Sequence, residues 1–201
     1  MPLTRRQAIV SSIAALTAAP GMAAAARLGD DGLHKQDWLL DSFLELPGDL
    51  AEARSAGKGL VVMFEQRGCP YCREMHSVNF ARPEIVDYAT AHFDILQLDL
   101  WGSREVTDFD GEALEERRLA RKWAVNFTPT LVFFGKDADA ASGKPGNAIA
   151  SAVMPGYFKP FHFLSMFEYV GDGHAGSEPF QRFLQEKIAA MREKGIDPEV
   201  W

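Results

Sequence analysis

Two cysteines are the residues of this sequence whose type and spacing are best suited to chemistry. Cys69 and Cys72 are separated by Pro70 and Tyr71, and the chain holds no other cysteine. A dithiol at this spacing can carry out thiol-disulfide exchange, because one thiolate attacks a partner disulfide and the second thiol resolves the mixed disulfide that forms. The pattern predicts Cys69 as the nucleophile and Cys72 as the resolving thiol.

A strand before the pair and a helix after it are expected to position the two sulfurs. Residues 60–65 form a short apolar run typical of a buried strand, and helical spacing covers residues 71–80. The first turn of a helix presents free N–H groups and the positive end of the helix dipole, which stabilise a thiolate. Pro70 suits that turn, since an N–H there would have no partner. We expect Cys69 to be exposed and Cys72 to be more buried. Tyr71 should lie at the surface beside the nucleophile.

Two other uses of the cysteines stay open at this level. The pair can be an inert staple, although so short a loop stabilises a fold little in the chain-entropy model. It can also bind copper or zinc, because Met75 and His76 follow closely and His76 lies four residues after Cys72, on the same helix face. The start of a helix explains the cysteines without a metal, so we predict no metal site.

The rest of the chain alternates helical and strand patterns. Apolar spacing predicts helices over residues 37–44, 49–56, 84–92, 112–124, 161–170 and 180–194, and strands over residues 93–100, 128–134 and 148–154. Residues 101–111 are expected to form a loop whose Trp101 and Phe109 make either a small core or a surface for a partner. This order predicts an α/β fold in which helices cover both faces of one mixed sheet.

The first 26 residues have the pattern of an export signal. Arg5 and Arg6 precede an apolar stretch over residues 8–19 and an alanine-rich run that a signal peptidase can cleave. The arginine pair also fits a twin-arginine signal, so the export route stays open. We predict a signal peptide over residues 1–26 and one domain over residues 27–201 in the periplasm. The net charge of −7 leaves no basic surface for nucleic acid.

A second motif, Phe127-Thr128-Pro129-Thr130, stands at the entrance to an apolar strand, sixty residues after Cys69. Together with the segment Val62-Met-Phe-Glu-Gln-Arg-Gly-Cys-Pro-Tyr-Cys, it resembles the thioredoxin superfamily and, more narrowly, the exported SoxW-type thioredoxins of bacterial sulfur-oxidation systems. The resemblance implies a thioredoxin fold with a cis peptide bond before Pro129, against the disulfide. It also implies a substrate-binding edge, where an extended segment pairs with the backbone, made by Pro70, Tyr71, Thr128, Pro129 and Gly156. Gly156 fits a plain turn equally well.

One position departs from the pattern of this family. Ordinary thioredoxins carry a buried aspartate six residues before the first cysteine, where this chain has Met63. Glu65 lies on the same strand face as Met63, because side chains alternate along a strand. We predict that Glu65 takes the proton from Cys72. The alternative is a partly exposed glutamate at the end of a strand.

The resemblance implies a reductase of protein disulfides that needs no cofactor. Its electrons would come from a membrane thiol transporter of the CcdA or DsbD kind. Its clients would be cysteine-bearing proteins of sulfur oxidation or cytochrome c assembly.

Three other functions share parts of this pattern. The same site can act as an oxidant or isomerase, because about 30 mV shifts the two-electron balance by about 1.4 kcal/mol. A glutaredoxin shares Cys-Pro-Tyr-Cys, but would be shorter and carry a Gly-Gly pair after the proline strand. A copper chaperone of this fold would use a wider cysteine spacing. We therefore expect an exported reductase.

Overall fold

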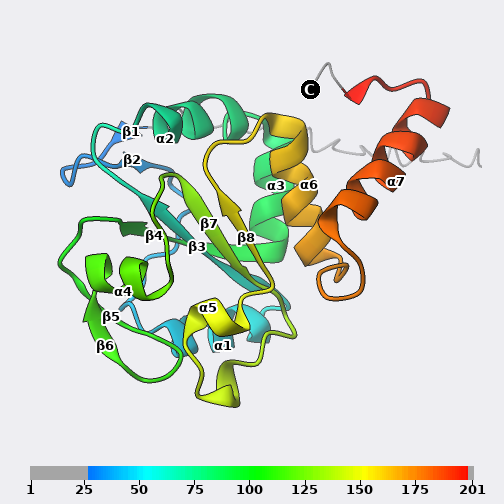
Figure 1. The fold of residues 1–201 in the computed structure, drawn as a ribbon. Coiled ribbons are helices and arrows are strands. Elements are labelled where there is room, and N and C mark those ends of the chain that lie inside the picture. The colour runs from blue at the N-terminus through cyan, green and yellow to red at the C-terminus, as the bar shows by residue number, and fades with distance from the viewer. Residues whose placement is uncertain (1–26, 199–201) are drawn as a thin grey trace, which may run out of the picture.

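The computed structural model describes residues 27–198, and their centre is a four-stranded mixed sheet in the order β4-β3-β7-β8 (Figure 1). Strand β3 (Gly59–Glu65) pairs in parallel with β4 (Phe93–Asp99) and antiparallel with β7 (Thr130–Phe134). The edge strand β8 (Ala152–Pro155) pairs antiparallel with β7. The predicted signal peptide over residues 1–26 lies outside the described residues.

Helices cover both faces of this sheet, as the sequence predicted. Helices α1 (Leu46–Ser55) and α4 (Glu116–Lys122) lie on one face, and α3 (Pro83–His92) and α6 (Pro160–Gly171) on the other (Figure 1). Alternation along β3 divides the core. Val62 and Phe64 pack in the first of two apolar clusters, and Val61 and Met63 pack in the second.

The active-site helix and several short elements complete the fold. Helix α2 (Pro70–Glu74) continues without a break into a π-helical turn, Met75–Asn79. The short strands form two hairpins, β1 (Arg27–Leu28) with β2 (His34–Lys35) and β5 (Glu105–Thr107) with β6 (Ala113–Glu115). A 3-10 turn (Ala140–Ser142), α5 (Gly146–Ile149) and α7 (Phe180–Glu193) follow along the chain.

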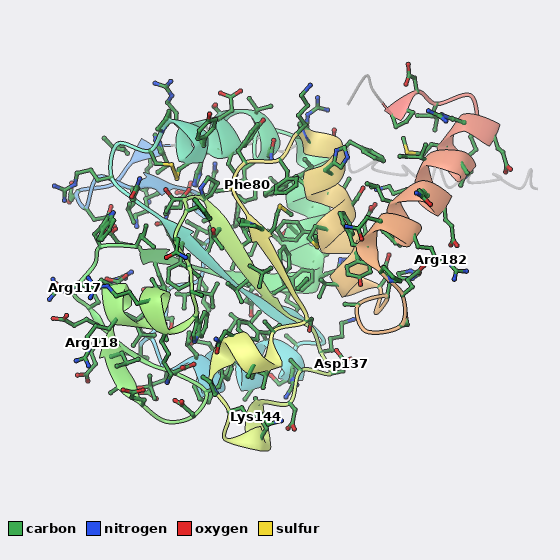
Figure 2. All side chains as sticks on the ribbon, viewed as in Figure 1. Phe80, Arg117, Arg118, Asp137, Lys144 and Arg182 are labelled. Carbon is green, nitrogen blue, oxygen red and sulfur yellow. A yellow bond between two sulfur atoms is a disulfide. The ribbon has the colours of Figure 1, made fainter. Side chains whose placement is uncertain are left out.

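Charged and apolar side chains separate as this architecture requires. Arg117 and Arg118 on α4 and Arg182 on α7 point away from the protein, whereas Phe80 lies inside, beside α6 (Figure 2). Of the described helices, none is long and apolar enough to cross a membrane.

The helix predicted over residues 37–44 is wrong. This segment runs beside β4 without regular structure, and the N–H of Leu40 donates to the carbonyl of Ile95 at 2.9 Å. Leu39 packs against one apolar cluster and Leu40 against the other, so neighbouring side chains point to opposite faces of the sheet. A segment that covers a sheet edge in this way needs apolar residues at adjacent positions, which resembles helical spacing in the sequence.

Two further boundaries differ from the predictions. The helix expected over residues 112–124 begins later, at Glu116, because residues 113–115 form β6 and bury Leu114 opposite Val106. The strand expected over residues 148–154 begins only at Ala152, after the single turn of α5.

Candidate active site

The two cysteines form a disulfide at the start of α2, with their Cα atoms 5.3 Å apart. Cys69 is the N-cap residue of the helix, and its Sγ accepts a hydrogen bond from the backbone N–H of Cys72 at 3.0 Å. Pro70 takes the first helical position, where no N–H partner is lost. Gly68 turns the chain into the helix at φ +72°, a conformation that favours glycine. The helix-start geometry predicted for Cys69 is confirmed.

Both sulfur-bearing residues are more enclosed than the sequence indicated. Cys69 is 4 % exposed and Cys72 is 1 % exposed, so the order is as predicted but Cys69 is not an exposed residue in the disulfide form. Thr128 lies against the Cys69 sulfur. Its carbonyl oxygen lies 3.6 Å from the Cys69 Sγ, and its hydroxyl donates to that sulfur at 3.4 Å.

The loop before β7 lies against the disulfide as the resemblance implied. The peptide bond between Thr128 and Pro129 is cis. Gly156, at φ +88°, follows β8 and donates its N–H to the carbonyl of Pro129 at 2.7 Å. The structure therefore brings Thr128, Pro129 and Gly156 to one side of the disulfide, and their contact with substrate stays a prediction.

Exposed aromatic side chains surround this otherwise buried disulfide. Tyr71 is 61 % exposed and stacks on Tyr157, with ring centroids 6.5 Å apart. Phe127, directly before Thr128, is also exposed. Trp101 is 63 % exposed, and its indole N–H donates to the Gln66 side-chain oxygen at 2.7 Å, on the loop that leads to Cys69. Burial raises the pKa of Tyr157, so its hydroxyl stays protonated at neutral pH.

The two aromatic residues singled out in the loop have different environments. Phe109 is buried in the first apolar cluster, stacked on Trp123 and against Phe134. Trp101 stays at the surface beside Gln66. The core interpretation is confirmed for Phe109 alone.

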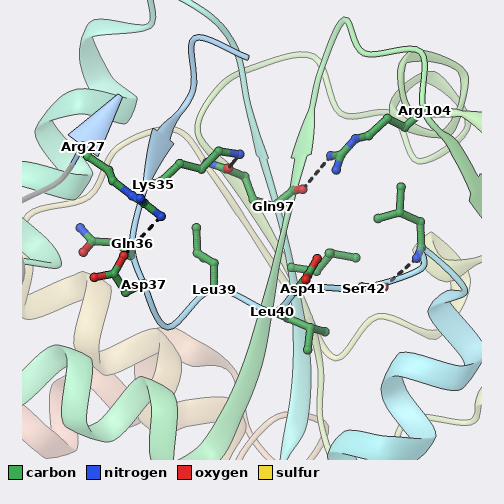
Figure 3. Close-up of a pocket in the computed structure, with 12 residues that line it drawn as sticks. Arg27, Lys35, Gln36, Asp37, Leu39, Leu40, Asp41, Ser42, Gln97 and Arg104 are labelled. Carbon is green, nitrogen blue, oxygen red and sulfur yellow. Dashed lines mark hydrogen bonds and ion pairs between the residues drawn. The ribbon is translucent and has the colours of Figure 1, made fainter. Parts of the chain in front are cut away.

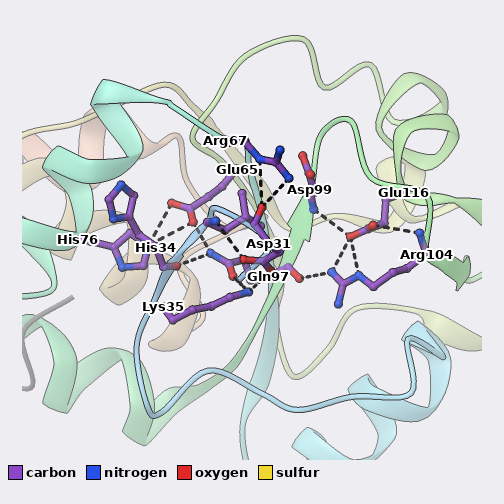
Figure 4. A network of polar contacts seen from close by, with 11 residues as sticks. Asp31, His34, Lys35, Glu65, Arg67, His76, Gln97, Asp99, Arg104 and Glu116 are labelled. Carbon is purple, nitrogen blue, oxygen red and sulfur yellow. Dashed lines mark hydrogen bonds and ion pairs between the residues drawn. The ribbon is translucent and has the colours of Figure 1, made fainter. Parts of the chain in front are cut away.

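Glu65 lies at the end of β3 and is completely buried at 0 % exposure, so the alternative of a partly exposed glutamate is wrong. Its two carboxylate oxygens lie 3.1 and 3.2 Å from Nε2 of His76, which is 1 % exposed (Figure 4). The side-chain amide of Gln97 also donates to the Glu65 carboxylate. A buried carboxylate held by two donors is an arrangement that compensates for lost hydration.

Sequence reasoning noticed His76 only as a possible metal ligand and missed Gln36 and Gln97. The four-residue spacing from Cys72 placed His76 on the correct helix face, but its partner is Glu65 rather than a metal. Met75, the other residue weighed as a ligand, packs in the second apolar cluster. Within residues 27–198, no group of three or more His, Cys, Asp or Glu side chains is arranged to hold a metal ion.

Comparison with known proteins agrees with this architecture. A family model described as a thioredoxin-like domain matches residues 46–171. The chain belongs to the thioredoxin-like family. None of the curated proteins compared with it matches its sequence.

Solved structures show the same fold at low sequence identity. A thioredoxin-fold protein from Helicobacter pylori is 24% identical, with a TM-score of 0.50 over 66% of this chain and 81% of that one. A thioredoxin from Thermus thermophilus is 22% identical, with a TM-score of 0.50 over 66% of this chain and 88% of that one. This thioredoxin-like fold holds the Cys69–Cys72 disulfide where a helix begins beside a cis-proline loop, an arrangement suited to thiol-disulfide exchange.

Proposed function

We propose that this protein is an exported thiol-disulfide oxidoreductase that reduces disulfides of client proteins in the periplasm. The observation that carries the proposal is the Cys69–Cys72 disulfide at the first turn of α2, with Thr128 against the sulfur of Cys69. The first turn stabilises a thiolate on Cys69, because N–H groups and the positive end of the helix dipole face that sulfur. Cys72, nearly fully buried one turn later, is protected from clients and meets only Cys69.

The reaction proceeds in two exchanges. The Cys69 thiolate attacks one sulfur of the client disulfide, forms a mixed disulfide and releases the other client sulfur as a thiolate. Cys72 loses its proton and attacks the Cys69 sulfur, which re-forms the disulfide and releases the second client thiol. The client gains two electrons and the protein loses two.

An external dithiol must then restore the reduced form. We propose a membrane thiol transporter of the CcdA or DsbD kind as this donor, and cysteine-bearing proteins of sulfur oxidation or cytochrome c assembly as the clients. Both proposals rest on the predicted export signal together with the resemblance to SoxW-type thioredoxins.

Trapping with the Cys72→Ser variant tests this function. Without a resolving thiol, the mixed disulfide on Cys69 should accumulate in cells and appear as a larger band that collapses on reduction. The control is the double variant Cys69→Ser, Cys72→Ser, which should trap nothing. An absence of mixed disulfides in the single variant, with reduced Cys69 confirmed by alkylation, would contradict the proposal.

A further inference from the structure

The buried pair of Glu65 and His76 sits one helical turn from the resolving cysteine. Cys72 and His76 are four residues apart on the continuous helix 70–79, so their side chains are neighbours on one face, and each is 1 % exposed. Glu65 approaches the same helix from β3 and contacts it through the His76 ring. Burying an ionisable pair costs free energy. Its position beside a thiol that must lose a proton therefore points to a functional role.

Hydrogen bonds around the His76 ring fit one tautomer. The side-chain nitrogen of Gln36 lies 3.3 Å from Nδ1, and an amide nitrogen donates, so Nδ1 is the acceptor in this arrangement. Nε2 then donates to Glu65. With Gln97 donating to the same carboxylate, the arrangement is that of a carboxylate beside a neutral imidazole, a pair that can accept one proton. If Nδ1 becomes protonated, a half-turn of the Gln36 amide presents its oxygen instead.

An open polar pocket adjoins the pair. Gln36 and Gln97 line this pocket of about 320 Å³ beside β4, together with Lys35, Asp37 and Arg104 (Figure 3). The two glutamines therefore belong both to the hydrogen bonds of the buried pair and to the lining of the pocket.

Several charged or titratable groups surround the pair and this pocket. His34 lies against the His76 ring, with centroids 5.6 Å apart, and burial lowers its pKa. The Lys35 ammonium donates to Gln97 at 2.6 Å and pairs with Asp31 at 2.7 Å (Figure 4). Arg73 on α2 and Arg104 in the loop before β5 also lie nearby.

We propose that Glu65 and His76 act as one proton-accepting unit for Cys72, held in its basic form by Gln36 and Gln97. This inference rests on the proposed function and adds His76 as a member of the proton-accepting unit and Gln36 as a positioning residue. In the second exchange the proton of the Cys72 thiol passes to the Glu65–His76 unit, and the Cys72 thiolate attacks the Cys69 sulfur. The mixed disulfide breaks, the client leaves as a thiolate, and the unit then releases the proton to solvent. Gln36 lies outside residues 46–171, so the hairpin before the family-matching region completes the unit.

The aromatic disulfide dithiobis-nitrobenzoate separates the two exchanges, because each one releases a coloured thiolate. Mixed with reduced protein, it reports attack by Cys69 in the first phase and attack by Cys72 in the second. For Glu65→Gln we expect the second phase to slow by about a hundredfold at neutral pH, the low end for loss of a general base. His76→Gln should slow the same phase by a smaller factor, since its amide still donates to Glu65 but cannot take a proton. The first phase should keep its rate in both variants.

A pH series makes the test specific to proton transfer. As the pH rises, hydroxide takes over removal of the proton, and the variants should approach the parent rate. Gln36→Leu should give a weaker version of the same profile, and His162→Gln, at an exposed position of α6, is the matched control that should change neither phase. A second phase in His76→Gln and Gln36→Leu that follows the parent at every pH would overturn the proposal. Loss of the first phase in the parent protein would instead contradict the oxidoreductase function itself.

Discussion

Tyr71 is 61 % exposed on the active-site helix and lies two residues from the nucleophile. Its ring stacks on Tyr157, whose hydroxyl donates a hydrogen bond to the Asn79 side chain at 3.3 Å. The two rings form a firm apolar wall beside a sulfur that is itself almost covered. We expect a client segment that reaches Cys69 to lie along this wall.

We expect Tyr71→Ala to weaken client binding more than chemistry. Loss of one aromatic contact at the centre of an interface costs about 1 kcal/mol, or about a fivefold rise in KM. Turnover of a disulfide-bearing peptide at saturation and both phases with dithiobis-nitrobenzoate should stay close to the parent values. The control Tyr71→Phe keeps the ring and should keep the KM. Equal losses with the peptide and the small reagent would show that Tyr71 acts on the cysteines instead.

At the level of single residues, the sequence predicted the reactive atoms but not their surroundings. The Cys-x-x-C motif, the preceding strand and Thr128-Pro129 are local patterns, and each was found where expected. The partners of Glu65 come from residues 11 and 32 positions away, and no local pattern links them. Spacing marked His76 as a neighbour of Cys72, yet only the fold shows that Glu65 meets it.

Asp108 is a buried carboxylate that links the segment between β4 and β7 to α5. Asp108 is fully buried and accepts hydrogen bonds from the backbone N–H groups of Phe109 at 2.8 Å and Gly146 at 2.9 Å. The indole of Trp123 donates to it at 3.2 Å, and the Lys122 ammonium lies 2.8 Å away. These contacts join β5, α4 and α5 at one point, which explains how so irregular a segment keeps a fixed shape.

We expect Asp108→Ala to destabilise the protein by about 3 kcal/mol, because it leaves the buried N–H groups of Phe109, Trp123 and Gly146 without their acceptor. Urea unfolding followed by circular dichroism measures this loss. Asp110→Ala is the matched control. Asp110 also pairs with Lys122, and that hydrogen bond lowers its pKa, but it lies near the surface and should cost less than about 1 kcal/mol. Similar losses for the two variants would contradict the central role of Asp108.

The strands of the central sheet and the helices that cover it could be predicted, because apolar residues recur along each of them with one period, that of a strand or that of a helix. Residues 113–115 could not, because alanine, leucine and glutamate all have a high helix propensity, whereas in the fold Leu114 pairs with Val106 in the β5–β6 hairpin. This pairing with a distant strand is not visible in a local window.

On the scale of the whole molecule, α7 lies away from the Cys69–Cys72 disulfide. It packs on α6 through Phe180 and Phe183 against Tyr169, and Lys187 pairs with Glu168, but the helix has no fully buried residue. Figure 1 shows it projecting from the side of α6, away from α2. The family match ends at residue 171, before this helix begins.

We therefore expect removal of residues 179–201 to leave both phases with dithiobis-nitrobenzoate unchanged. The midpoint of urea unfolding should fall, since Tyr169 loses its aromatic neighbours. Stopped-flow absorbance and equilibrium unfolding of the same sample separate the two effects. A slower first or second phase in a folded, truncated protein would show that α7 influences the disulfide.

The Glu65–His76 pair bears on protein engineering, because its parts come from four places in the chain. Glu65 ends β3, His76 lies on the π-helical turn, Gln97 belongs to β4 and Gln36 follows the first hairpin. Grafting Cys-Pro-Tyr-Cys onto another thioredoxin scaffold would transfer the sulfurs without this environment. The motif is portable, whereas the machinery proposed to move its proton is a property of the scaffold.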